Sequence, residues 1–230
     1  MVHSIVLQTM KPDRFILWLP NRCEKQPGVE YVLPDWLKGF PTLEVRRGTR
    51  DWGSATKLIP TLEEESHPDT RIITFDDDVA YERHAIEELV NGAKRWPRRA
   101  LCFMGCIDGV HVHSEKILGL RMDVAVMGGF RGVLYKRSFF DDEIFVEMAE
   151  LLKDGPFLAD DQLFSWHLMR RGIKRSVVAT KYRGDDPDRL NCRFAEFTDG
   201  IYCGPNGELA QQSIERLKAL YDRNGWKRSQ

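Results

Sequence analysis

Short apolar runs and helically spaced apolar residues alternate along most of the chain. Runs of β-branched, aliphatic or aromatic residues without helical spacing predict strands, here at 15–19, 43–46, 72–75, 101–104, 124–127, 133–135 and 176–179. Apolar residues three and four positions apart predict helices, here at 4–9, 56–65, 81–96, between Asp142 and Gly155, at 162–171 and at about 208–223. This order predicts an α/β protein in which helices flank a mixed sheet.

Length and composition place the chain among ordinary globular proteins. The 230 residues fit one domain, 1–230, with its core at about 4–180 and a loop and C-terminal helix over 181–230. A composition of 42% hydrophobic and 30% charged residues is typical of this class. The formal net charge of −1 lacks the basic excess of a nucleic-acid-binding protein, so we expect no nucleic-acid partner.

The cysteines and the chain start predict a cytoplasmic protein. Cys23, Cys102, Cys106, Cys192 and Cys203 are irregularly spaced and form no CxxC pair. They therefore indicate neither a zinc ribbon nor a disulfide framework, and we expect free thiols in a reducing compartment. No apolar stretch reaches membrane-spanning length, and the first residues lack the pattern of a signal peptide.

An acidic triplet follows the strand expected at 72–75. Asp76, Asp77 and Asp78 repel one another and resist removal from water, so they need either solvent or a divalent cation. Ligands of open α/β sheets lie at the carboxyl ends of strands. An extended backbone turns Asp76 and Asp78 to the same side and Asp77 away. Two carboxylates in that position suit Mg²⁺ or Mn²⁺, and a solvated loop is the alternative.

A second acidic pair, Asp160 and Asp161, opens the helix at 162–171. Carboxyl groups in two different environments can take separate roles. The triplet would hold a metal, and the pair would supply a general base for an incoming hydroxyl. The alternative is an ordinary helix N-cap with a favourable dipole interaction.

Two further segments could contact an anion. Lys57 precedes a short helix and is either a phosphate-binding cation or a solvated lysine. The glycine-rich turn 128–132 lets backbone approach a ligand and offers Arg131 as an anion partner, or it is a simple turn between strands. The turn matches neither GxGxxG nor a Walker loop, so neither nucleotide-binding fingerprint is present.

Three histidines are candidate metal ligands by residue type, but their positions predict no binding site. His111 and His113 are spaced like residues on one strand face, and without a third ligand nearby in sequence we expect a surface or edge feature. His167 lies on the apolar face of its helix, which favours a core histidine with a satisfied hydrogen bond.

The ordered series of segments resembles nucleotide-sugar-dependent glycosyltransferases of the GT-A type. The segments run from Ser4 to Gly172 and read SIVLQT–KPDRFILWLP, DWGSATKLIP, IITFDDDVAY, GGFRGVLYKRSFF and ADDQLFSWHLMRRG. The triplet resembles the DxD motif of that family, and ADDQ resembles its later acidic motif. The resemblance implies a GT-A-like mixed sheet and sugar transfer from a UDP- or GDP-linked donor to a glycan or lipid-linked acceptor. A lipid-linked acceptor would bring peripheral membrane contact.

The resemblance also implies roles for individual residues. Asp161 would be the catalytic base of an inverting reaction, with Asp160 as its acidic neighbour, and Asp78 with Asp76 would hold Mn²⁺ or Mg²⁺. The residues implied for binding the nucleotide sugar are Asp51, Lys57, Asp76, Asp77, Gly129, Arg131 and Gly132.

One departure from the family pattern concerns the chain start. Members of this family usually begin with a strand and a helix ahead of the segment like SIVLQT, and we expect an N-terminally shortened fold here. A non-catalytic glycan- or nucleotide-binding protein derived from a shortened transferase is therefore an alternative. Nucleotidyl transfer could use the same triplet, but it needs basic residues on a glycine-rich loop that the sequence lacks.

Overall fold

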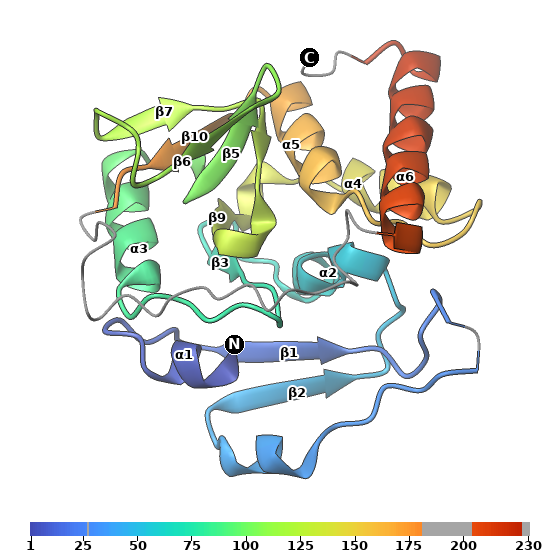
Figure 1. Ribbon diagram of the computed structural model, residues 1–230, viewed down its shortest axis with the longest axis horizontal. Coiled ribbons are helices and arrows are strands. Elements are labelled where there is room, and N and C mark those ends of the chain that lie inside the picture. Colours follow the sequence, from blue (N-terminus) through green and yellow to red (C-terminus); the bar gives the residue numbers. More distant parts are fainter. Residues whose placement is uncertain (27, 181–203, 227–230) are drawn as a thin grey trace.

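The computed structural model describes residues 1–26, 28–180 and 204–226, and it has an α/β architecture of mixed sheets flanked by helices (Figure 1). Its centre is a five-stranded sheet in the order β3-β9-β4-β10-β7. Strand β10 is parallel to β4, whereas the other neighbouring pairs are antiparallel. The strands are β3 (Arg71–Thr74), β9 (Val133–Lys136), β4 (Arg99–Cys102), β10 (Lys174–Val178) and β7 (Arg121–Asp123).

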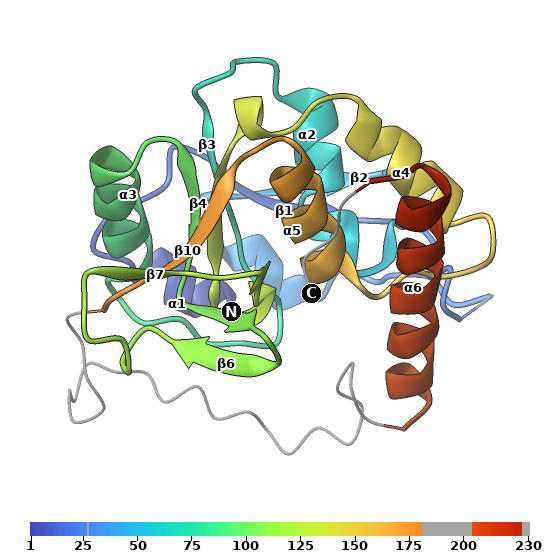
Figure 2. The ribbon, with the colours of Figure 1, turned by 90° about the horizontal axis from the view of Figure 1, so that it is seen from above.

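The central strands are apolar on both faces because helices cover both faces. Helix α3 (Ala85–Arg95) lies on one side of the sheet, and α4 (Glu143–Leu151), α5 (Asp160–Arg170) and α6 (Gly204–Arg223) lie on the other (Figure 2). Successive strand residues face opposite sides. Leu101 packs with the core of α3, whereas its neighbour Cys102 packs with the core of α5 and α6.

Two smaller sheets complete the structure. Strands β1 (Phe15–Leu19) and β2 (Leu43–Arg47) pair in parallel, next to α1 (Val2–Val6) and the 3₁₀ helix η1 (Asp35–Gly39). Strands β5 (Met104–Ile107), β6 (Val110–His113) and β8 (Val126–Met127) form a three-stranded antiparallel sheet. The remaining 3₁₀ helices are η2 (Gly53–Lys57), η3 (Gly129–Arg131) and η4 (Arg137–Phe139).

Most of the elements expected from the sequence are present, with shifted ends. The helix expected at 56–65 divides into η2 and α2 (Ile59–Glu64), and Pro60 occupies the first turn of α2, where its missing N–H costs nothing. The strand expected at 101–104 divides into β4 and β5, and β6 and β7 were not expected. The irregular loop expected from 181 up to the C-terminal helix at about 208 lies outside the described residues as far as 203, together with Cys192 and Cys203, and its last four positions belong instead to α6, which begins at Gly204. Cys23, Cys102 and Cys106 are free thiols.

The helix expected to begin at Tyr81 instead begins at Ala85. The Tyr81 side chain is 2% exposed, and its hydroxyl contacts backbone groups of Asp76 and Phe130. That anchoring holds Tyr81 against the end of β3 and keeps residues 81–84 out of the helix, so the helix starts later than the apolar pattern suggested.

Candidate functional site

The structure brings the two acidic segments together around Lys57. Lys57 ends η2, Asp76 follows β3, and Asp160 begins α5. The Lys57 Nζ atom lies 2.6 Å from Asp76 Oδ1 and 3.0 Å from Asp160 Oδ2. Three segments far apart in sequence therefore meet through one ammonium group.

The surroundings of Lys57 keep it charged. Its side chain is 17% exposed, and that of Asp160 is 5% exposed. Removal from water favours a neutral lysine, but the nearby carboxylates of Asp160, Asp76 and Asp161 outweigh this and raise the pKa of Lys57 well above its ordinary value. One cation thus faces three carboxyl groups, and the local charge is negative when all three are ionised.

Asp161 accepts a hydrogen bond from the glycine turn. Both of its carboxylate oxygens lie 3.0 Å from the backbone N of Gly129. A Cβ at position 129 would lie 2.6 Å from Asp161 Oδ1 and 2.9 Å from Lys57 Nζ, so this close approach requires glycine. The turn that the sequence predicts to approach a ligand therefore also contacts Asp161.

The pKa of Asp161 is raised to about 7. The largest cause is removal from water, followed by the charge of Asp160, while Lys57 and the Gly129 N–H act in the opposite direction. A carboxyl group that exchanges its proton near neutral pH can accept a proton from a hydroxyl during a reaction. Its neighbour in sequence, Asp160, is also buried.

Asp76 is held at the site by both its side chain and its backbone. Removal from water raises the pKa of its carboxyl, and the charge of Lys57 counters this. Its backbone N–H donates to the Tyr81 hydroxyl oxygen over 2.7 Å, and that hydroxyl donates to the Phe130 carbonyl over 2.9 Å. Tyr81 therefore fastens the end of β3 to the glycine turn; no sequence signal separated it from an ordinary helical aromatic.

The rest of the acidic triplet faces solvent. Asp77 and Asp78 are exposed, whereas the Asp76 carboxylate is engaged by Lys57. In the described part of the chain, no three His, Cys, Asp or Glu side chains gather closely enough to hold a metal ion. Mg²⁺ and Mn²⁺ are often bound by one or two carboxylates together with substrate phosphates and water. The sequence predicted Asp76 and Asp78 as the ligand pair; Lys57 engages the Asp76 carboxylate, so Asp78 is the exposed member of that pair available to such a donor set.

Lys57, Asp76, Asp160 and Asp161 form what we call the carboxylate cluster. Asp51 lies outside this cluster and holds the segment that leads to Lys57. It is 6% exposed and accepts hydrogen bonds from the backbone N–H groups of Gly53 and Glu24, both over 2.9 Å. Gly53 has a φ of +62°, and a Cβ there would lie 2.2 Å from the Phe157 carbonyl oxygen. These contacts fix the start of η2, which ends in Lys57.

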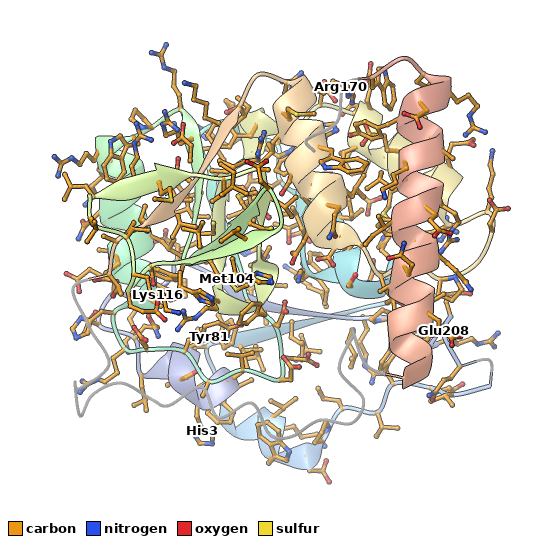
Figure 3. All side chains as sticks on the ribbon, turned by 45° about the horizontal axis from the view of Figure 1, so that its top comes forward. His3, Tyr81, Met104, Lys116, Arg170 and Glu208 are labelled. Atoms are coloured by element: carbon orange, nitrogen blue, oxygen red, sulfur yellow. The ribbon has the colours of Figure 1, made fainter. Side chains whose placement is uncertain are left out.

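The other end of the glycine turn lines a small hollow beside the cluster. Arg131 pairs with Glu115 over 3.0 Å, and sequence reasoning did not single out Glu115. Gly132 has a φ of +97° and a Cβ there would lie 2.7 Å from the Phe75 ring, so this position also requires glycine. Tyr81, which is labelled in Figure 3, is one of the residues that line this hollow. The lining residues are Tyr81, Glu82, Ala85, Phe103, Ser114 and Arg131.

The histidines behave largely as expected. His167 is fully buried, with Nδ1 3.2 Å from Glu147 Oε1, which confirms its place in the core. His111 and His113 lie on β6 with ring centroids 6.3 Å apart, and neither belongs to a metal-binding group among the described residues.

Comparison with known proteins assigns no family. No protein-family model matches the sequence, and no curated protein matches it. Within the described ranges, no helix combines the length and apolar character needed to cross a membrane. The site must therefore be interpreted from its own chemistry.

Proposed function

We propose that this chain is a glycosyltransferase with a GT-A-like fold. It would move a sugar from a UDP- or GDP-linked donor to a hydroxyl of a glycan or lipid-linked acceptor, with inversion at the anomeric carbon. The observation that carries the proposal is Asp161: a carboxyl whose pKa is about 7, held by the Gly129 N–H beside the acidic end of β3. The order of the sequence motifs supports the same class.

The proposed reaction uses these residues in distinct roles. The acceptor oxygen attacks the anomeric carbon, and its proton passes to the Asp161 carboxylate. The new C–O bond forms as the bond from the anomeric carbon to the diphosphate oxygen breaks, and the electron pair leaves with the nucleoside diphosphate. The Gly129 N–H fixes the orientation of Asp161, because it contacts both carboxylate oxygens.

The diphosphate would lie at the acidic end of β3. Asp78, with Asp76 beside it, would hold Mn²⁺ or Mg²⁺ there, and such an ion would neutralise the charge on the leaving diphosphate. Lys57 offers an ammonium group next to Asp76, where it can orient a phosphate oxygen. Asp51 keeps η2 and its lysine in place through the Gly53 N–H.

Calorimetric titration with UDP and GDP, with and without Mn²⁺, tests the proposal. We expect one nucleotide to bind only with Mn²⁺, and Asp78→Ala to abolish that binding. Asp35→Ala is the matched control, since Asp35 is an exposed aspartate on η1 and should leave binding unchanged.

Binding of neither nucleotide by the folded protein would contradict the proposal. Binding without transfer or donor hydrolysis, unaffected by Asp161→Asn, would support the non-catalytic alternative instead.

A further inference from the structure

Three large apolar side chains are exposed on β7 and on the segment that leads into it. Leu118 is 102% exposed, Leu120 is 55% exposed and Met122 is 43% exposed. They occupy alternate positions, and Met122 lies on β7, which is an edge strand of the central sheet. A single exposed leucine is ordinary, but neighbouring exposed apolar side chains mark an interaction surface.

Basic side chains from α3 adjoin this segment. The guanidinium of Arg95 lies 5.3 Å from the Trp96 ring centroid, and that of Arg121 lies 5.7 Å from the same ring. Asp123 pairs with Arg99 over 2.7 Å and also with Arg121. The end of α3 and β7 therefore form one continuous surface, which we name the β7–α3 surface; it comprises residues 94–99 and 116–122.

The charge of the β7–α3 surface is strongly positive. Residues 94–99 and 116–122 contain no acidic residue. Of the flanking carboxylates, Glu115 pairs with Arg131 outside the surface, whereas Asp123 pairs with Arg99 and Arg121 and offsets one of the six positive charges. The six basic residues of this surface are Lys94, Arg95, Arg98, Arg99, Lys116 and Arg121.

We propose that the β7–α3 surface docks onto an anionic lipid membrane. Exposed leucine and methionine side chains can enter the boundary between headgroups and acyl chains, and surrounding cations attract anionic headgroups. Both features are present on this surface, whereas a purely apolar patch would fit a protein partner equally well. The proposal concerns binding alone and does not depend on the proposed transferase activity.

If the proposed function holds, membrane docking through this surface would bring a lipid-linked acceptor close to the protein. Ser114 lines the hollow beside the carboxylate cluster, and Lys116, labelled in Figure 3, begins the segment that carries Leu118. A docked membrane would then lie a few residues along the chain from this hollow, whose Tyr81 contacts the backbone of Asp76.

Co-sedimentation with lipid vesicles tests the proposal on the full chain. We expect binding to vesicles of phosphatidylcholine mixed with phosphatidylglycerol, and much weaker binding to phosphatidylcholine alone. Leu118→Ser should lower the partition coefficient about tenfold, because it removes one inserted leucine side chain. The double variant Lys94→Ala/Arg98→Ala should lower it about 25-fold, at about fivefold per charge.

Val32→Ser is the matched control, since Val32 is 80% exposed on the segment between β1 and η1, away from β7 (Figures 1 and 2). It should leave vesicle binding unchanged. Equal binding to neutral and anionic vesicles, or no loss in Leu118→Ser, would overturn the proposal. A dimer in solution that Leu118→Ser dissociates, without vesicle binding, would assign the surface to a second copy of the chain instead.

Discussion

Replacing Asp161 by asparagine tests separately how much this carboxylate destabilises the fold and whether the proposed reaction needs it. The amide side chain would retain an oxygen that accepts from the Gly129 N–H, but it cannot ionise. In the wild type the pKa of Asp161 is raised from 3.8 to about 7, so the folded protein holds a proton that the unfolded chain has lost between those values. The folded state is therefore destabilised as pH rises through this range, and the loss is complete above about pH 7.

The magnitude follows from the pKa. A rise of about three pKa units corresponds to about 4 kcal/mol between the two protonation states. That difference already includes the attraction of Lys57, so we expect Asp161→Asn to be more stable than the wild type by about 4 kcal/mol at pH 8. Below about pH 4 both proteins should be equally stable, because the wild-type carboxyl is then protonated in the folded and the unfolded states.

Urea denaturation at about pH 4 and about pH 8 measures this difference. Asp35→Asn, at an exposed surface aspartate, should show no such pH-dependent gain. In the Asp161→Asn variant we also expect loss of sugar transfer, whereas the wild-type rate should rise with pH through about 7 as Asp161 loses its proton. An Asp161→Asn protein that is less stable than the wild type at pH 8 would refute the reasoning about this carboxyl.

Two further substitutions test the supports of the site by chemical denaturation. Lys57→Met should destabilise the protein by about 2 to 4 kcal/mol, because it leaves partly buried carboxylates without their cation; an unchanged midpoint would show that Lys57 is dispensable there. Gly132→Ala should cost about 2 to 3 kcal/mol through the Phe75 ring and its positive φ, whereas Gly155→Ala, also at positive φ but in open space, should cost about 1 kcal/mol. Equal losses would contradict the steric argument.

The sequence by itself determined the class of fold and the location of its acidic segments. Strand and helix periodicities report which residues of a local segment are buried, and that information is present in the chain. It was enough to predict β1 and to place β3 directly before the acidic triplet. It was also enough to place Asp160 and Asp161 at the start of α5.

Element boundaries and short polar strands were harder to predict. Strand β7 consists of Arg121, Met122 and Asp123, so it contains no run of apolar residues, and it forms by pairing with β10. The start of α3 moved because Tyr81 uses its hydroxyl at the end of β3. In both cases a tertiary contact overrode the local pattern.

Only the tertiary structure decided which of the candidate residues act together. It placed Lys57 between Asp76 and Asp160, brought Gly129 against Asp161, and gave Asp51 a supporting role away from the cluster. Residues so far apart in sequence meet through packing of the sheet and its helices, and no local pattern records that proximity. The raised pKa of Asp161 has the same origin, because it depends on the water excluded and the charges gathered by the folded chain.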